Sequence, residues 1–257
     1  MQKAIAVGLS HPAVILDEMG TWVTGEVLGI DFETTGVDRF NDVPVSYALV
    51  HARAGRILVS WSGVIDPGRE IPAEATAVHG ITTEHARTEG MPLEEAIGLV
   101  SDAVVSAGRR RVPIVGMKLD YDLTILEIQA ERLIGIGPVG RGWHGPVLDA
   151  IVLDRHFDRY RRGRRTLADL CDVYGVELEN AHDATADATA SIRVLYALAA
   201  RRRELRTGDP ETIHRAQVHW HRQWAIGYDE WRLSEGMIPI DPRDYVWPVA
   251  PRAAPAA

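Results

Sequence analysis

Three apolar, β-branched runs near the start of the chain constrain its fold more than any other feature. They span residues 25–32, 44–52 and 56–66, and a short Arg-Ala-Gly between the last two is typical of a hairpin. Further along, the fully apolar run VPIVGM (112–117) is typical of a buried parallel strand, and stretches with helical spacing lie on both sides of it. This order predicts an α/β domain with a mixed sheet.

Helical periodicity fills most of the remaining chain. Apolar residues recur at helical spacing in five stretches, and residues 145–157 predict a short strand that runs into a helix. We expect a lead-in (1–22), one large domain (23–206), a helix rich in large rings (207–236) and a Pro/Ala-rich tail (237–257). The five helical stretches are 92–108, 121–135, 165–176, 183–205 and 211–236.

Composition narrows the class of protein only broadly. The chain has 257 residues, of which 46% are hydrophobic and 25% charged, and this is ordinary for a soluble globular protein. A net charge of −8 excludes a general basic coat for nucleic acid but leaves a local basic groove open. Cys171, the single cysteine, is expected to be a buried core thiol. Because no stretch approaches the roughly 20 apolar residues that span a bilayer, and the N-terminal stretch lacks the pattern of a signal peptide, we expect a cytoplasmic protein without membrane contact.

Acidic side chains interrupt the first strand at two positions. Asp31 and Glu33 stand in the stretch GIDFETTG (29–36), and residues two apart on a strand share one face. Two neighbouring carboxylates repel each other and are costly to bury, unless a cation compensates their charge. The sequence therefore predicts that this pair holds a positively charged group.

Two further acids and a histidine stand near the starts of predicted helices. Asp122 follows the strand 112–117, and His182 and Asp187 flank the start of the helix 183–205. Taken singly, each has an ordinary explanation, because a first-turn carboxylate is favoured by the helix dipole and Asp183 or Thr185 could be a plain N-cap. Their combination with the two strand acids is what points to chemistry.

The combined pattern is Asp-x-Glu, then Asp, then His-x-x-x-x-Asp. It resembles the DEDDh group of 3′–5′ exonucleases, the DnaQ-like branch of the ribonuclease H-like fold, and is similar to the proofreading epsilon subunit of bacterial DNA polymerase III. The segments ATAVHGIT (75–82) and DRYRRGRRTLADLCDVYGV (158–176) are also similar to this group. The resemblance covers roughly residues 25–205 and implies an α/β, ribonuclease H-like fold. The implied sheet is mixed and five-stranded and is flanked by helices. The predicted C-terminal helix is extra to it, because the family's motifs do not explain the last helix or either terminus.

The resemblance also implies how the acids are used. Hard divalent cations such as Mg²⁺ or Mn²⁺ prefer carboxylate oxygens, and a pair of them can stabilise both oxygens of an in-line phosphodiester cleavage. By resemblance, Asp31 would bridge two such ions. Glu33 and Asp187 would complete the site that activates water, and Asp122 would support the second ion. His182 would be the general base that accepts a proton from the water.

Substrate contacts are implied beside the strand acids. The backbone of Thr34 and Thr35 is expected to approach the terminal 3′ nucleotide, and Gly36 to let the chain turn away. His79, in the segment VHGIT, is either a substrate contact or a capping or core histidine. Tyr121, which precedes Asp122 at the family's spacing, is assigned to the substrate as well.

One segment departs from the family's pattern. Members usually carry a His-Asn or similar polar pair shortly before the second acid, whereas this chain has Met117 and Lys118. Lys118 is either a phosphate contact or a solvated loop lysine. Asp120 competes with Asp122 for the metal role, and we favour Asp122 because its neighbours follow the family's spacing.

Two further clusters leave alternatives open. The arginine-rich stretch 159–165 is either a phosphate clamp or a solvated charged face. In the last helix, large rings recur at the spacing of a single stripe, which favours packing against the body over base stacking or the docking of a polymerase or a second copy. The rings are those of Trp220, Trp224, Tyr228 and Trp231.

The resemblance implies a single-stranded nucleic acid 3′ end as the partner, together with a DNA polymerase subunit in the proofreading case. DNA is favoured over RNA because the segment 75–82 is typical of the proofreading type. A 3′–5′ exoribonuclease is the alternative enzyme. From another class, the alternative is a catalytically inactive nucleic-acid-binding or scaffold module.

Overall fold

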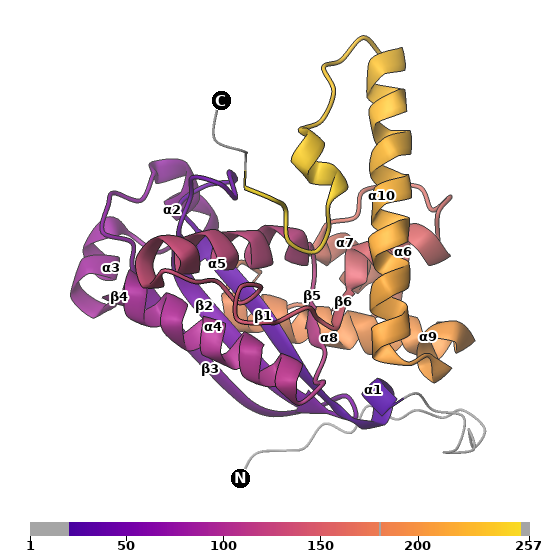
Figure 1. Cartoon of the computed structure of the whole chain (residues 1–257), viewed down its shortest axis with the longest axis horizontal. Helices are drawn as coiled ribbons and strands as arrows, with labels where there is room; N and C mark the ends of the chain where they lie inside the picture. The colour runs from indigo at the N-terminus through magenta and orange to yellow at the C-terminus, as the bar shows by residue number, and fades with distance from the viewer. Residues whose placement is uncertain (1–20, 180, 253–257) are drawn as a thin grey trace.

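A computed structural model describes residues 21–179 and 181–252, and these form a mixed six-stranded sheet with helices on both faces (Figure 1). Of the predicted lead-in, only the last two residues belong to the described part, and residues 253–257 of the predicted tail lie outside it. In spatial order the strands are β4 (Met91–Pro92), β3 (Arg56–Asp66), β2 (Pro44–Arg53), β1 (Glu26–Thr34), β5 (Ile114–Gly116) and β6 (Val147–Asp149).

The sheet contains both kinds of strand pairing that the sequence predicted. β1, β2 and β3 are antiparallel neighbours, whereas β5 and β6 join β1 in parallel. The sheet has one strand more than the five expected, because β4 pairs in parallel with the end of β3. β4 has only two residues, one of them a proline, so no periodicity in the sequence marks it.

Helices cover both faces of the sheet. In Figure 1, α4 (Leu93–Arg109) and α5 (Leu119–Ile134) lie in front of the strands, and α8 (Ala184–Arg201) lies behind them. The other helical elements are α1 (Thr21–Thr24), α2 (Ala73–His79), α3 (Thr83–Glu89), α6 (Ala150–Phe157), α7 (Leu167–Tyr174), α9 (Arg203–Thr207), α10 (Pro210–Ser234) and the short 3₁₀ helix η2 (Pro242–Tyr245).

The period-2 pattern of β1 separates two apolar clusters. Leu28, Ile30 and Phe32 belong to the cluster under α4 and α5, whereas Val27 belongs to the cluster under α8. Gly29 follows Val27 on the α8 face, where an added Cβ would lie 2.8 Å from Cδ1 of Ile192. The odd-numbered positions of β1 therefore face α8, and close packing of α8 on the strand requires a glycine here.

The last helix covers an edge of the sheet. Within residues 21–179 and 181–252, no strand neighbours the outer edge of β6, and side chains of α10 bind its backbone instead. Gln217 donates from Nε2 to the carbonyl of Val147 (2.8 Å) and accepts the N–H of Asp149 at Oε1 (2.8 Å). His214 Nδ1 accepts the N–H of Val147 (3.3 Å). An edge strand with free backbone groups invites pairing with other chains, and α10 removes that exposure.

The aromatic stripe of α10 contributes only part of its contact with the body. Trp220 packs on the core and stacks on His156, with ring centroids 3.6 Å apart. Further along, Trp224, Tyr228 and Trp231 stack on one another, and Trp231 is 48% exposed. The buried face of the helix runs instead through residues such as Ile213, Gln217, His221 and Ala225. The face of α10 that packs on the body therefore carries polar groups that bind the sheet edge. Most of the aromatic stripe, which periodicity alone predicted to pack there, lies beside this face.

The described part of the predicted tail packs on the body. Trp247 is buried in the cluster under α4 and α5, and the N–H of Ala250 donates to Oγ1 of Thr124 (2.9 Å). In Figure 1 this segment descends beside α10 and crosses over α5. The Pro/Ala-rich sequence of this segment has no pattern that would predict these contacts. Among the described residues, no helix combines the length and the apolar character needed to cross a membrane.

Candidate active site

β1 carries two acids beyond the part of the strand that pairs with β5. β5 pairs only with Leu28 and Gly29, so the last residues of β1 have no strand on that side in the described part of the chain. Asp31 and Glu33 continue the α8 face of the strand, and each is partly exposed. Within the described residues, neither carboxylate makes a hydrogen bond or an ion pair. The strand therefore presents two unpaired carboxylates at the end of a buried face.

α5 brings a third acid to the same place. Asp122 is 4% exposed, and its Oδ1 accepts the N–H of Phe32 (3.0 Å). This bond satisfies a backbone donor of β1 that the short β5 leaves free. Asp120, the competing acid, instead forms an ion pair with the buried Arg39 (2.5 Å). Asp122 thus lies beside the strand acids, whereas Asp120 is occupied by its ion pair with Arg39.

The turn before α5 is held by a buried acid of β6. Lys118 has a left-handed backbone (φ 62°) and precedes the first residue of the helix. Asp149 Oδ1 accepts the N–H of Lys118 (3.1 Å), and its Oδ2 accepts the N–H of Leu119 (2.8 Å). Burial raises the pKa of Asp149 to about 6, against the lowering effect of these N–H groups. Asp149 therefore fixes where α5 begins and, with it, the position of Asp122.

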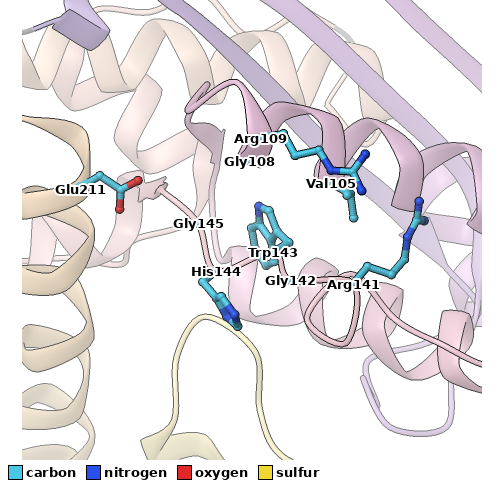
Figure 2. Close-up of a pocket in the computed structure, with 9 residues that line it drawn as sticks. All are labelled: Val105, Gly108, Arg109, Arg141, Gly142, Trp143, His144, Gly145 and Glu211. Atoms are coloured by element: carbon cyan, nitrogen blue, oxygen red, sulfur yellow. The ribbon is translucent and has the colours of Figure 1, made fainter.

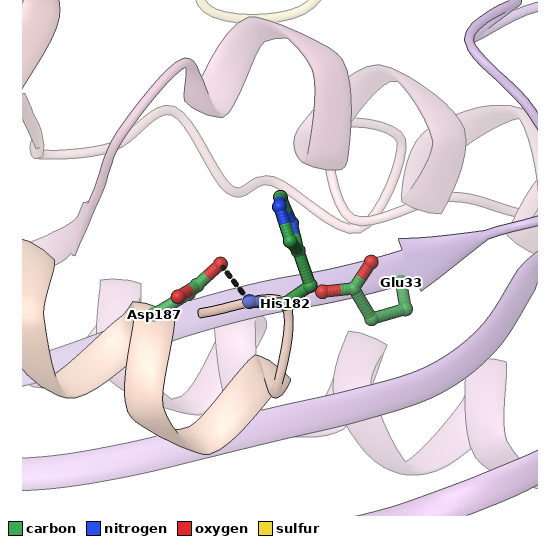
Figure 3. A group of neighbouring side chains, drawn as sticks. All are labelled: Glu33, His182 and Asp187. Carbon is green, nitrogen blue, oxygen red and sulfur yellow. Dashed lines mark hydrogen bonds between the residues drawn. The ribbon is translucent and has the colours of Figure 1, made fainter. Parts of the chain in front are cut away.

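The start of α8 supplies the remaining two residues. Asp183 caps the helix by accepting the N–H of Ala186, which leaves Asp187 in the first turn. His182 has a left-handed backbone (φ 69°), and its N–H donates to Oδ2 of Asp187 (3.3 Å). Figure 3 shows this bond and the approach of Glu33 from β1. Ligand atoms of Glu33, His182 and Asp187 all lie within 4.8 Å of one another.

The acids raise one another's proton affinity. Burial raises the pKa of Asp31 well above its usual range, and the charges of Asp122, Asp187 and Glu33 raise it further. Burial and Asp187 likewise raise the pKa of Glu33 to about 8. The pKa of Asp122 rises to about 7, chiefly through burial. Such a cluster is stable in its ionised form only when a cation shares it.

One buried oxygen shows that the site fits a metal ion. Burial raises the pKa of Asp187, and the N–H of His182 occupies only its Oδ2. Oδ1 of Asp187 is buried and has no hydrogen-bond partner among the described residues. A buried carboxylate oxygen without a donor is costly, whereas oxygen is the ligand atom that hard divalent cations prefer.

The turn after β1 is braced by hydroxyl groups. Thr34 Oγ1 donates to the carbonyl of Gly36 (2.7 Å), and the Tyr121 hydroxyl donates to the same carbonyl (2.5 Å). Thr35 Oγ1 donates to Oδ1 of Asp42 (2.7 Å), and a Cβ at Gly36 would lie 2.6 Å from Oδ2 of Asp42. These four of the predicted substrate residues thus lie in or beside the turn that follows the strand acids. The hydroxyls of Thr34, Thr35 and Tyr121 hold this turn in place.

His79 and Lys118 lie on two sides of the same region. His79 Nδ1 accepts the N–H of Ile81 (3.1 Å). Burial lowers the pKa of His79, the Thr34 backbone opposes this, and the charge of His182 lowers it further. Lys118 is exposed, with its ammonium 5.3 Å from the ring centroid of Tyr121. Both residues are therefore near the acids, His79 beside His182 and Lys118 beside Tyr121.

The arginine-rich stretch divides into two roles. Arg161 and Arg165 both donate to Oδ2 of Asp154 (2.9 and 2.7 Å), whose side chain is fully buried. The Tyr174 hydroxyl donates to the other oxygen of the same carboxylate (2.7 Å). These two guanidinium groups therefore pin the connection before α7 and are not free for phosphate. The exposed arginines of the stretch are Arg159, Arg162 and Arg164.

A separate cavity of about 250 Å³ lies between α4, the loop before β6 and the start of α10 (Figure 2). Figure 2 shows its arginines, Arg109 and Arg141, at one side and Glu211 at the other. None of the acids described above lines it. The cavity is therefore not part of the candidate active site.

Sequence reasoning missed the residues that position the acids. Asp149 carries a local signal, because an acid between an apolar strand and a helix is a common N-cap, and it does accept the N–H of Ile151 (2.9 Å). Gln217 carries none, since its partners Val147 and Asp149 lie about 70 residues away and only the folded chain joins them. Arg39 is similar, because its pairing with Asp120 spans 81 residues.

Comparison with known proteins decides the family. The sequence profile of the RNase_T exonucleases matches residues 28–195, which is more than half of the chain. The chain belongs to this exonuclease family. The DEDDh resemblance that the acids suggested is therefore confirmed.

Relatives of the exonuclease domain include polymerase components. The DNA polymerase III PolC-type protein of Streptococcus suis is 27% identical over 198 residues, which cover 76% of this chain and 12% of that protein. The DNA polymerase III subunit epsilon-like protein of Rhodobacter capsulatus is 32% identical over 186 residues, covering 66% of this chain and 24% of that protein. The chain thus spans only a small part of the length of these relatives.

Solved structures share the fold of this chain. E. coli Exonuclease I, in complex with a dA16 oligonucleotide, aligns with a TM-score of 0.60 and 20% identity. The alignment covers 77% of this chain and 44% of that one. The predicted ribonuclease H-like, α/β architecture is therefore confirmed, with the additional short strand noted above.

Proposed function

We propose that this chain is a 3′–5′ exonuclease that hydrolyses the terminal phosphodiester bond of single-stranded DNA and releases nucleoside 5′-monophosphates. One observation carries the proposal. Three separate elements bring Asp31, Glu33, Asp122 and Asp187 together beside His182, and the side chains of the two strand acids have no hydrogen-bond or ion-pair partner among the described residues. A structural cluster of acids would pair with arginine or lysine, whereas this one fits a cation that arrives with the substrate.

The four carboxylates would hold two divalent ions, Mg²⁺ or Mn²⁺. Such ions, when bound, supply charge neutralisation for the scissile phosphate and an activated water. The charges of Asp122, Asp187 and Glu33 all act on Asp31. A carboxylate with three acids near it would suit a ligand shared between two cations. The free Oδ1 of Asp187 would serve as a further ligand.

His182 would move the proton. Its imidazole is exposed at the mouth of the site, where it can exchange protons with solvent. Its left-handed backbone and the bond from its N–H to Asp187 fix it above the acids. A neutral imidazole in this place can accept the proton of an attacking water and pass it on.

The backbone of the turn 34–36 would receive the terminal nucleotide. The hydroxyls that brace this turn keep it rigid, and a rigid turn can position the reacting bond. Lys118 would contact a phosphate from the exposed side, and His79 would approach the last nucleotide from α2. We place the catalytic domain at residues 23–206 and regard α10 and the following segment as its support.

Single-stranded DNA is favoured over RNA because of the relatives. Two relatives in sequence are named as a DNA polymerase III PolC-type protein and a DNA polymerase III subunit epsilon-like protein, and Exonuclease I of similar fold is bound to a DNA oligonucleotide. These names also support a DNA polymerase subunit as partner. Trimming of RNA is the second candidate.

The experiment uses 5′-labelled DNA and RNA strands of the same sequence with the full chain. Each is incubated with Mg²⁺, with Mn²⁺ or with a chelator, beside the variants Asp31→Asn and Asp102→Asn. Asp102 is an exposed acid of α4 that pairs with Arg141 and serves as the matched control.

We expect a metal-dependent ladder that shortens from the 3′ end and is absent in Asp31→Asn but present in Asp102→Asn. The faster substrate decides between DNA and RNA. A chain that binds both strands yet cuts neither with either metal would establish the inactive binding module instead.

A further inference from the structure

The aromatic stripe of α10 ends in a stack of flat groups that the body covers only in part. We call it the α10 stack, and its members are Arg155, Trp224, Tyr228 and Trp231. The guanidinium carbon of Arg155, on α6, lies 3.5 Å from the ring centroid of Trp224. Ring centroids of Trp224 and Tyr228 are 5.2 Å apart, those of Tyr228 and Trp231 are 5.6 Å apart, and both pairs are close to parallel. Trp231 is 48% exposed, and no other ring or cation of the described chain lies over it, so the stack has an open end. In Figure 1 the last turns of α10 extend past the helices that cover the sheet.

Arg155, at the other end of the α10 stack, has donors that the described chain does not use. Its guanidinium makes no hydrogen bond and no ion pair within residues 21–179 and 181–252. Burial lowers the pKa of Arg155 to about 10, and the charges of Asp149 and Asp120 oppose that lowering, so the group is a cation at neutral pH. A guanidinium that stacks on an indole keeps the N–H groups at its edge free. A phosphate is an acceptor that fits this fork.

A short series of contacts joins the start of the α10 stack to the candidate active site. His221, one turn before the first ring of the stack, has Nε2 2.9 Å from the carbonyl oxygen of Asp244 in η2. The side chain of Asp244 pairs with Arg39, which also binds Asp120. Asp120 stands in the first turn of α5 together with Asp122, one of the site's acids. The stack is therefore continuous with the support of the site.

Cations accompany the rings of this surface, although the whole chain carries a net charge of −8. The guanidinium carbon of Arg232 lies 5.7 Å from the ring centroid of Tyr228. The ring of Phe157, at the end of α6, meets that of Trp220 edge-on at 5.7 Å, and the arginine-rich stretch 159–165 follows in the chain. Rings interleaved with cations suit the bases and phosphates of a single strand. The apolar face of a partner helix would instead require an apolar groove.

We infer that the α10 stack binds the part of a single nucleic acid strand that lies 5′ to the nucleotide at the acids. A base would continue the stack on the open side of Trp231, and a phosphate would accept the free N–H groups of Arg155. Both contacts are independent of base sequence, so the strand would be held without base preference. The inference rests on the proposed function, because it requires a strand whose 3′ end lies at the acids.

The first measurement is the binding of 5′-labelled oligothymidylate to the full chain by fluorescence anisotropy, in chelator so that the strand stays intact. Strands of about 4 and about 16 nucleotides span the usual site sizes for single strands. Trp231→Ala should weaken binding of the longer strand about 5- to 100-fold, the loss expected for one base stacked on a ring. Trp61→Ala is the matched control, because Trp61 is 51% exposed but lies on β3, and it should bind as the wild type does.

Salt dependence separates the phosphate contact from the base contact. Each phosphate contact to a single strand adds about 0.7 to the steepness with which log affinity falls with log salt concentration. Arg155→Gln should reduce this steepness by about 0.7, and Arg155→Lys, which keeps the charge, should restore it. Trp231→Ala should lower the affinity and leave the steepness unchanged. Arg87→Gln, which removes an exposed arginine of α3, is the control for charge. Circular dichroism and thermal unfolding check that each variant is folded.

The inference is supported if Trp231→Ala and Arg155→Gln lose affinity for the longer strand more than for the shorter one, with the salt dependence divided as stated. It is overturned if the wild type does not bind the longer strand, or if both variants bind it as tightly as the wild type does, which would leave the rings to a protein partner. Cleavage of the same strands with Mg²⁺ is measured separately. A chain that binds through the stack but cuts neither strand overturns the proposed function alone, whereas one that cuts both without using the stack overturns this inference alone.

Discussion

Replacing Asp122 with asparagine should make the metal-free protein more stable, although it should damage the active site. Asp122 is nearly fully buried beside other acids, and its pKa is raised from 3.8 to about 7, chiefly by burial. The folded state therefore holds this proton more tightly than the unfolded chain does. As pH rises from about 4 to about 7, stability is lost, and the loss is complete above the folded pKa.

The shift sets the size of the effect. About three pKa units correspond to roughly 4 kcal/mol of charge penalty in the folded protein above pH 7. Asparagine removes this penalty and keeps an oxygen for the N–H of Phe32, while its buried amide donors cost part of the gain. We expect the free energy of unfolding to rise by about 2–4 kcal/mol at about pH 8 in chelator, and by less at about pH 5.

Urea unfolding with and without divalent metal measures this prediction. Metal should stabilise the wild type, because it binds only the folded state, and should stabilise Asp122→Asn less. Asp120→Asn is the control on the same helical turn. Asp120 pairs with the buried Arg39, so its loss should destabilise the protein by about 1–3 kcal/mol. If Asp122→Asn lowers stability in chelator as Asp120→Asn does, the electrostatic account of the site is refuted.

Three further substitutions test how the site is supported. Gln217→Leu leaves two backbone groups of β6 unpaired, so unfolding in urea should show a loss of about 2–4 kcal/mol, whereas the exposed Gln223→Leu should stay within about 0.5 kcal/mol. Tyr121→Phe removes one of two donors to the carbonyl of Gly36; steady-state kinetics on labelled DNA should show a higher KM, with metal affinity measured by titration unchanged. Trp247→Ala should lower the free energy of unfolding by about 3–5 kcal/mol, because this ring is buried in the core, and equal stability would show that the segment after α10 is dispensable.

Local patterns in the sequence determined the acids and the faces on which they stand. The spacing of Asp31 and Glu33 places both side chains on one face of any strand, whatever the strand packs against. The starts of α5 and α8 were predicted from apolar runs next to polar residues, and Asp122 and Asp187 lie in the first turns of these helices. A family resemblance could be drawn from these positions because each depends on neighbours in the chain.

Only the tertiary structure decided what holds the acids in place. The bond from Phe32 to Asp122 joins residues 90 apart, that from Asp149 to Gln217 joins residues 68 apart, and Ala250 reaches Thr124 across 126 residues. Sequence periodicity does not predict such partners. It indicates which face of a helix or strand is buried, whereas the partner of a side chain depends on how distant segments of the chain pack together. The two-residue strand β4, the covered edge of β6 and the exposed edge of β3 belong to the same class. They exist only once the sheet has assembled, since an edge is a property of the whole sheet and not of any strand within it.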